Sequence, residues 1–190
     1  MPEASTPALG RPRADVDETV FAATLRSVDE LGYAGATMDR IAAAAGVAKT
    51  TLYRRWPSKG VLITECLAHT FGPPPAPGSR WLPSTDPREA YPAAIRWVAA
   101  RIGEPGVGAA FAGVFTDAIS DPALREFLLH RLQDPYQDAL QEALGESTEH
   151  FLLHVDVIVG TLLHRLGIRG APMAEADVEA LITLILGDLA

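Results

Sequence analysis

The sequence has little cysteine and no long apolar run, and each shortage excludes a class of protein. One cysteine, Cys66, in 190 residues rules out an intrachain disulfide framework. Hydrophobic residues make up 48% of the chain, yet no apolar run reaches the roughly 18 residues needed to span a bilayer. The N-terminus lacks the apolar stretch of a secretion signal, so we expect a cytoplasmic protein that contacts no membrane.

The signatures of catalysis are missing as well. The sequence contains no Gly-rich phosphate loop, nucleophile elbow or paired catalytic carboxylates, so we expect no enzymatic activity and no cofactor. His150 and His154 lie four residues apart, a helical spacing that can hold a metal ion, with His130 and His164 as candidate third ligands. His154 also lies in an apolar run, where core or pocket histidines are commoner. We therefore assign no metal site and keep a metal-responsive protein as an alternative.

An excess of positive charge is absent overall but present locally. The net charge is −8, and residues 72–190 account for all of it with 8 basic and 16 acidic residues. Residues 1–71 hold 8 of each, and within them the stretch 40–64 has five basic residues and no aspartate or glutamate. A cationic area on an otherwise acidic protein fits a polyanion that is contacted through a small surface.

Capping residues, proline and glycine divide the chain into helices. Thr37 precedes a short helix that stops at Gly46, and Asp-Pro pairs at 86–87 and 121–122 are typical helix starts. No segment alternates with a period of two, so we predict an all-α fold, with Pro135 kinking one helix. The predicted helices cover about 15–31, 38–45, 48–55, 58–71, 87–103, 107–119, 122–143, 148–166 and 174–189.

The stretch IAAAAGVAKTTLYRRW, residues 41–56, has the pattern of a helix-turn-helix. Helical spacing turns Leu52 and Trp56 inward, whereas the Lys49–Tyr53 and Thr50–Arg54 rows face outward. Lysine can reach guanine O6 and N7, threonine can contact bases, and tyrosine or arginine can hold phosphate. The outward rows therefore predict a helix that reads the major groove.

The stretch ATMDRIAAAAGVAKTTLYRRWPSKGVLITECL, with its surroundings at about 15–71, resembles the DNA-binding domain of the tetracycline-repressor (TetR) family of bacterial regulators. The resemblance implies a homodimer in which an N-terminal three-helix helix-turn-helix domain joins a larger helical domain for ligand binding and dimerisation. It also implies a phosphate contact at Thr37, operator contacts by Lys49, Thr50 and Tyr53, and mainly backbone contacts by three basic residues. The implied DNA-binding set is Thr37, Lys49, Thr50, Thr51, Tyr53, Arg54, Arg55 and Lys59.

The proline and glycine content and the resemblance together suggest how the chain is divided into domains. We predict a flexible basic arm at 1–14, the helix-turn-helix domain with a connecting helix at 15–71, and a Pro/Gly-rich linker at 72–86. An effector-binding and dimerisation domain follows at 87–190, and its last two helices, about 148–166 and 174–189, would pair two subunits. Candidate pocket residues are Trp97, Phe111, Phe115, Phe127 and His154.

These observations predict a dimeric transcriptional repressor that a small apolar effector releases from a pseudo-palindromic operator. A helix-turn-helix regulator without a small-molecule effector is the nearest alternative. The sequence leaves open the effector, the operator and the regulated genes, the choice between repression and activation, and how the linker transmits ligand binding.

Overall fold

The fold is helical, as predicted. The computed structural model describes residues 13–74, 76, 78–80, 82–144 and 148–188, and every regular element within these ranges is a helix. Ser79 and Leu82 form an isolated antiparallel bridge between the helices. The elements are α1 (Arg13–Gly35), α2 (Met38–Ala45), α3 (Lys49–Arg55), α4 (Lys59–Phe71), α5 (Pro87–Ile102), α6 (Val107–Ser120), α7 (Pro122–Leu128), η1 (Leu129–Gln133), α8 (Asp134–Leu144), α9 (Thr148–Arg169) and α10 (Glu175–Asp188).

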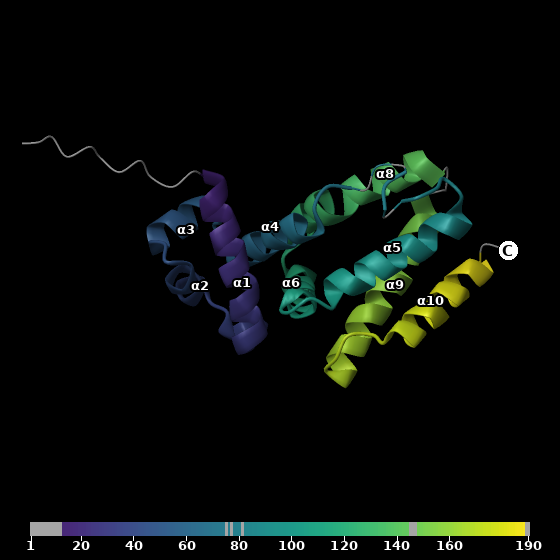
Figure 1. Ribbon diagram of the computed structural model, residues 1–190. Helices are drawn as coiled ribbons and strands as arrows, with labels where there is room; N and C mark the ends of the chain where they lie inside the picture. Colours follow the sequence, from purple (N-terminus) through teal and green to yellow (C-terminus); the bar gives the residue numbers. More distant parts are fainter. Residues whose placement is uncertain (1–12, 75, 77, 81, 145–147, 189–190) are drawn as a thin grey trace, which may run out of the picture.

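Figure 1 shows α1, α2 and α3 together at one end of the molecule, with α4 leading away from them toward the remaining helices. The C-terminus lies at the opposite end (Figure 1). The N-terminal basic arm predicted at 1–14, with Arg11 and Arg13, lies mostly outside the described residues, and its last two residues, from Arg13, belong to α1. The arm therefore stays a prediction.

Capping explains how the helix-turn-helix is bounded. The Thr37 hydroxyl accepts a hydrogen bond from the Arg40 backbone N–H at 3.3 Å, which starts α2. Gly46 ends this helix with a φ of 67°, a left-handed conformation that glycine adopts without a Cβ penalty. The Ser58 hydroxyl accepts from Val61 N–H at 3.2 Å and starts α4. These three boundaries agree with the sequence prediction.

The first helix differs from its prediction at both ends. It starts at Arg13 rather than 15 and extends to Gly35 rather than 31. Gly32, where we expected the stop, interrupts the helical backbone with a φ of 70° and a ψ of 166°. The helical backbone therefore stops at Gly32, where the sequence predicted a stop, and a short second segment that includes Tyr33 completes α1.

The predicted helix 122–143 was wrong as a single kinked α-helix. It consists of α7, a π-helical turn η1 and α8, and the π turn ends just before Pro135. Pro135 has no N–H to donate to the carbonyl of Arg131, and the wider π turn accommodates that missing bond.

One hydrophobic core runs through the described helices. At the α1–α4 end it includes Ile41, Leu52 and Leu62, each fully buried. It continues without a break through α5, α6 and α7 to α9 and α10. Leu82, in the stretch predicted to be a linker, is also fully buried. The division into domains remains a prediction, and apolar packing continues from the helices before the predicted linker at 72–86 to those after it.

Candidate nucleic-acid interface and interior cavity

The recognition helix α3 is held by two side chains that point inward. Leu52 is fully buried, and Trp56, which caps the C-terminal end of the helix, is 6% exposed. The Trp56 ring packs against Phe21 of α1 with ring centroids 5.6 Å apart. This packing fixes the orientation of α3 and leaves its opposite side facing solvent.

The outward rows predicted from sequence are exposed. Lys49, Thr50, Tyr53 and Arg54 all face solvent, whereas Thr51 is half-buried. Four hydrogen-bonding or cationic side chains thus share one accessible surface of α3, which we call the α3 face. Their chemistry suits contacts with base edges and phosphates.

An acidic residue next to the basic stretch changes the electrostatics of the α3 face. Asp39, one residue before the acid-free window, forms an ion pair with Lys49 at 2.5 Å. Both side chains are more than half exposed, so the pair is screened by solvent and adds little stability. The predicted DNA contact by Lys49 would require its ammonium to leave this carboxylate. The sequence analysis missed this partner because Asp39 belongs to the preceding helix.

Arg55 lies apart from the α3 face. Its guanidinium is 2.8 Å from the Asp17 carboxylate of α1 and 5.6 Å from the centroid of the Trp56 ring, and the side chain is only 22% exposed. This geometry ties α3 to α1. The predicted backbone contact by Arg55 would require the side chain to leave this pair.

Lys59 and Thr37 lie at the starts of α4 and α2. The Lys59 ammonium donates to the Tyr33 carbonyl at 3.0 Å and lies 3.7 Å from the centroid of the Tyr33 ring. Thr37 is exposed, and its hydroxyl already caps α2. Both residues therefore have local structural contacts in addition to their predicted contacts with the DNA backbone.

A cavity of about 710 Å³, which we call the interior cavity, lies between α5, α6, α7, η1, α8 and α9, and the end of α4 also borders it. It is open to solvent on one side, where exposed Ile119 belongs to its lining. Its volume falls in the range of small-molecule sites. Aromatic rings pack edge to face along its wall: Phe71 lies 5.4 Å from Trp97 and 5.3 Å from Phe111, and Phe111 lies 5.3 Å from Phe115 (centroid distances). The wall is therefore mainly apolar.

The structure brings four of the five predicted pocket residues to this cavity: Trp97, Phe111, Phe115 and His154. Phe127 is the exception, because it does not line this cavity. Leu124 and Leu128 form the buried side of α7, and Phe127 is half-buried beside them without lining the cavity. Residues two to six positions farther along, in η1, line the cavity instead: Leu129, Leu132 and Gln133.

The sequence analysis missed two polar residues of the cavity wall, Tyr91 and Tyr136. His154 is 3% exposed, and its Nδ1 lies 2.7 Å from the Tyr91 hydroxyl, with the two rings edge to face. Tyr136 donates its hydroxyl to the Gly72 carbonyl at 2.6 Å, and burial raises the pKa of this phenol to about 12. Tyr91 shares a helix face with Ile95, because they are four residues apart, so helical spacing could have revealed it.

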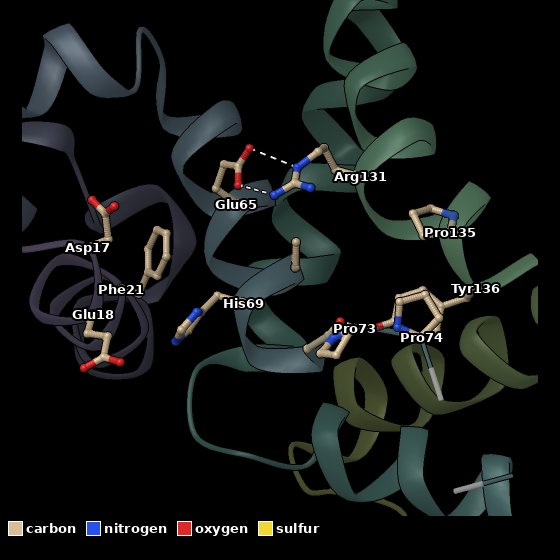
Figure 2. A pocket seen from close by; sticks show the side chains of 12 residues that line it. Asp17, Glu18, Phe21, Glu65, His69, Pro73, Pro74, Arg131, Pro135 and Tyr136 are labelled. Atoms are coloured by element: carbon tan, nitrogen blue, oxygen red, sulfur yellow. Dashed lines mark hydrogen bonds and ion pairs between the residues drawn. The ribbon is translucent and has the colours of Figure 1, made fainter. Parts of the chain in front are cut away.

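A second hollow, of about 690 Å³, lies between α1, α4 and the η1–α8 region. Figure 2 shows Glu65 and Arg131 facing each other across it, and Arg131 holds both Glu65 oxygens at 3.0 and 2.6 Å. The hydrogen bonds to Glu65 raise the pKa of Arg131. The Asp17 carboxylate on the opposite side already pairs with Arg55. The charged side chains Asp17, Glu65 and Arg131 in the wall of this hollow are thus already paired with one another or with Arg55.

A metal-responsive regulator would require residues that could bind a metal ion. Within the described part of the chain, no three His, Cys, Asp or Glu side chains gather where a metal ion could bind. The His150 side chain lies outside the described residues, so the predicted His150–His154 pair is not tested.

Among the described residues, none of the helices has the length and apolar character needed to cross a lipid bilayer.

Comparisons with known proteins agree with this geometry. Residues 20–66 match the family model of bacterial regulatory proteins, tetR family. The uncharacterised HTH-type transcriptional regulator Rv1556 of Mycobacterium tuberculosis is 26% identical over 174 residues, covering 86% of this chain and 82% of the relative.

Two solved structures share the fold. A protein of Mesorhizobium loti described as a TetR-family transcriptional regulator has a TM-score of 0.67 at 15% identity, covering 93% of this chain and 98% of that one. The fatty acid degradation regulator FadR of Bacillus halodurans has a TM-score of 0.68 at 17% identity, covering 97% of both chains.

Proposed function

The protein is a transcriptional regulator of the TetR family with an N-terminal helix-turn-helix, and from this premise we propose that it is a dimeric repressor released from its operator by a small apolar effector. The proposal includes a cytoplasmic location, where the chromosome is accessible. The observation that carries it is the α3 face, a set of exposed hydrogen-bonding and cationic side chains on a helix anchored by Leu52 and Trp56.

DNA recognition would divide between bases and backbone. Lys49, Thr50 and Tyr53 would enter the major groove, where lysine recognises guanine through O6 and N7. Arg54 and Lys59 would contact phosphates, as would Thr37 beside the free N–H groups at the start of α2. Thr51 and Arg55 would contribute at the edge of this surface, Arg55 only after leaving Asp17.

Two copies of the recognition helix are needed for a palindromic site. The buried sides of α9 and α10 include Leu162 and Ile182, whereas Ile168 of α9 and Leu184 of α10 are 74% and 67% exposed. Apolar side chains left in water on these two helices support pairing with the same helices of a second subunit. The two α3 helices would then enter successive major grooves roughly 34–36 Å apart.

The interior cavity supports the effector half of the proposal. Its aromatic wall suits an apolar molecule, and the Tyr91–His154 pair offers a hydrogen-bonding group at an otherwise apolar surface. An effector that binds one conformation better shifts the protein toward it, and operator binding must weaken effector binding by the same factor. A regulator without an effector would not show this reciprocity.

The test begins with in vitro selection of duplex DNA by the full-length protein, followed by titration at several salt concentrations. We expect a pseudo-palindromic site and a linear fall of log affinity with log salt. A flat salt dependence, or no selected sequence, would contradict DNA recognition by the α3 face.

A thermal-shift screen of small apolar molecules, followed by titration of hits against the protein–DNA complex, tests the effector. Hits that bind without changing operator affinity would favour the alternative without an effector.

A further inference from the structure

Helix α6 has two different contact faces. Phe111, Phe115 and Ala118 line the interior cavity. Gly113 and Asp117, on another side of the same helix, face Tyr33 of α1. A single helix therefore forms a wall of the proposed effector site and also contacts the N-terminal helices.

The contact at Gly113 leaves no spare room. A Cβ added to Gly113 would lie 2.0 Å from Cγ of Tyr33, closer than any real contact, so the ring rests directly on the backbone of α6. The Tyr33 hydroxyl donates to Oδ2 of Asp117. Burial and the Asp117 carboxylate raise the pKa of Tyr33, so the hydroxyl keeps its proton in the physiological range.

Tyr33 contacts the start of α4 as well. The Lys59 ammonium lies over the Tyr33 ring at 3.7 Å from its centroid and donates to the Tyr33 carbonyl at 3.0 Å. A cation over an aromatic face is attracted by the ring quadrupole. The Tyr33 ring and carbonyl together determine where the Lys59 ammonium lies. Lys59 is the first residue of α4, the helix that follows the helix-turn-helix.

We propose that Tyr33 is a positioning residue that couples the interior cavity to DNA binding, because it holds Lys59 in place while its ring and hydroxyl rest on Gly113 and Asp117. The inference rests on the proposed function, since Lys59 must contact the DNA backbone for its position to matter. An effector that displaces α6 moves the support of Tyr33. Lys59 then leaves its position, and its interaction with a DNA phosphate is weakened in each subunit.

The break at Gly32 makes such a movement local. The backbone of α1 departs from helical geometry at this residue, immediately before Tyr33. The segment that carries Tyr33 can therefore shift against α6 without moving Val28, which is buried in the core one turn earlier. Bistable contacts of this kind are the physical elements through which two sites are coupled.

The test uses full-length protein and the duplex selected by the unmodified chain. Gly113→Ala forces the Tyr33 ring from its seat, and we expect operator affinity to fall about tenfold, a typical size for coupling between sites. The dependence of log affinity on log salt should become shallower by about 0.9 for each phosphate that the protein no longer neutralises. Ala112→Ser, which adds one atom at an exposed position of the same helix, is the matched control and should change neither quantity.

A double-mutant cycle shows whether the effect passes through Tyr33. In a Tyr33→Ala background the ring is gone, so adding Gly113→Ala should change operator affinity by less than about twofold. An equal reduction in both backgrounds, or unchanged affinity in Gly113→Ala protein with a native thermal melt, would overturn the inference. Failure of the unmodified chain to select any duplex would refute the proposed function itself.

Hydrogen exchange gives a second measurement with a milder variant. Operator binding should slow amide exchange across α6, residues 107–120, in the unmodified chain and in Asp138→Asn, which alters an exposed carboxylate on α8. Asp117→Asn, which weakens the bond to Tyr33, should remove most of this protection. Equal protection in both variants, or unchanged exchange in the unmodified complex, would contradict coupling through Tyr33.

Discussion

Lys49 and Tyr53 lie one turn apart on the α3 face, and under the proposed function each should make a separable contribution to operator binding. We expect Lys49→Ala to cost about 1–3 kcal/mol of operator affinity, the range for a good base contact, and Tyr53→Phe to weaken binding because it removes one hydroxyl. Fluorescence anisotropy at fixed salt measures both. Arg26→Ala, an exposed residue of α1, removes a charge elsewhere and should have little effect. Unchanged affinity in both α3 variants would show that another surface reads the DNA.

Under the proposed function, Asp39 would compete with DNA for Lys49. Asp39→Asn removes the carboxylate that pairs with Lys49 and lowers negative charge beside the proposed interface. Operator affinity should therefore rise by about 0.2–1 kcal/mol, the usual size of an exposed pair. Asp29→Asn, an exposed carboxylate of α1, changes net charge equally and serves as the control. Equal gains in the two variants would mean that only net charge matters.

Helical spacing predicted which residues of α3 turn inward but not what they meet. The burial of Leu52 and Trp56 follows from their positions on the helix. The partners Asp39 and Asp17 come from α2 and α1, so nothing in the period of α3 reveals them. The same limit applies to Phe127, because aromatic character indicates burial in general without selecting the side of α7 that faces the cavity.

Helices α4 and α7 approach closely at Gly60. A Cβ on Gly60 would lie 2.7 Å from Cδ2 of Leu124, so Gly60→Ala should destabilise the protein by about 1–3 kcal/mol through overpacking. Urea unfolding measures this change. Combining Gly60→Ala with Leu124→Ala should remove the clash, so the two effects should not add. Strict additivity would show that Leu124 moves aside freely and that the approach is loose.

Local signals predicted most helix boundaries, and the failures have specific causes. Thr37, Gly46 and Ser58 each act within a few residues of their own backbone, so their effect can be read from sequence. The extension of α1 beyond Gly32 instead brings Tyr33 against α6, a contact between distant segments. The π turn before Pro135 carries Arg131, whose partner Glu65 lies on α4, again far away in the chain.

For the molecule as a whole, a palindromic operator would require a dimer, which we propose forms through α9 and α10. Ile168→Glu places a charge on an exposed apolar position of α9 and should shift sedimentation from dimer toward monomer, because burying an unpaired carboxylate is costly. Ile119→Glu, at a 79% exposed position on α6, is the matched control and should leave the dimer intact. Dissociation by neither variant would place the subunit contact on another surface.

The cavity and the contacts around Tyr33 arise only when the whole chain is assembled. Local sequence signals placed Trp97, Phe111 and Phe115 on helices. The space between their rings depends on the relative placement of α5, α6 and α9, which no local signal encodes. The continuous core across the predicted boundary has the same origin, since it joins buried residues of α4 to buried residues of α5 and α6.

Cys66 makes this chain convenient for distance measurements. It is the only cysteine, its side chain is fully buried, and its thiol points to the Phe21 carbonyl at 3.5 Å. Burial raises the pKa of this thiol to about 12, so almost no reactive thiolate exists near neutral pH. A new cysteine at exposed Ala44 of α2 would be the sole target for a nitroxide reagent. In the proposed dimer, the distance between the two spin labels would then report the separation of the two helix-turn-helix units, and the native thiol would stay unlabelled.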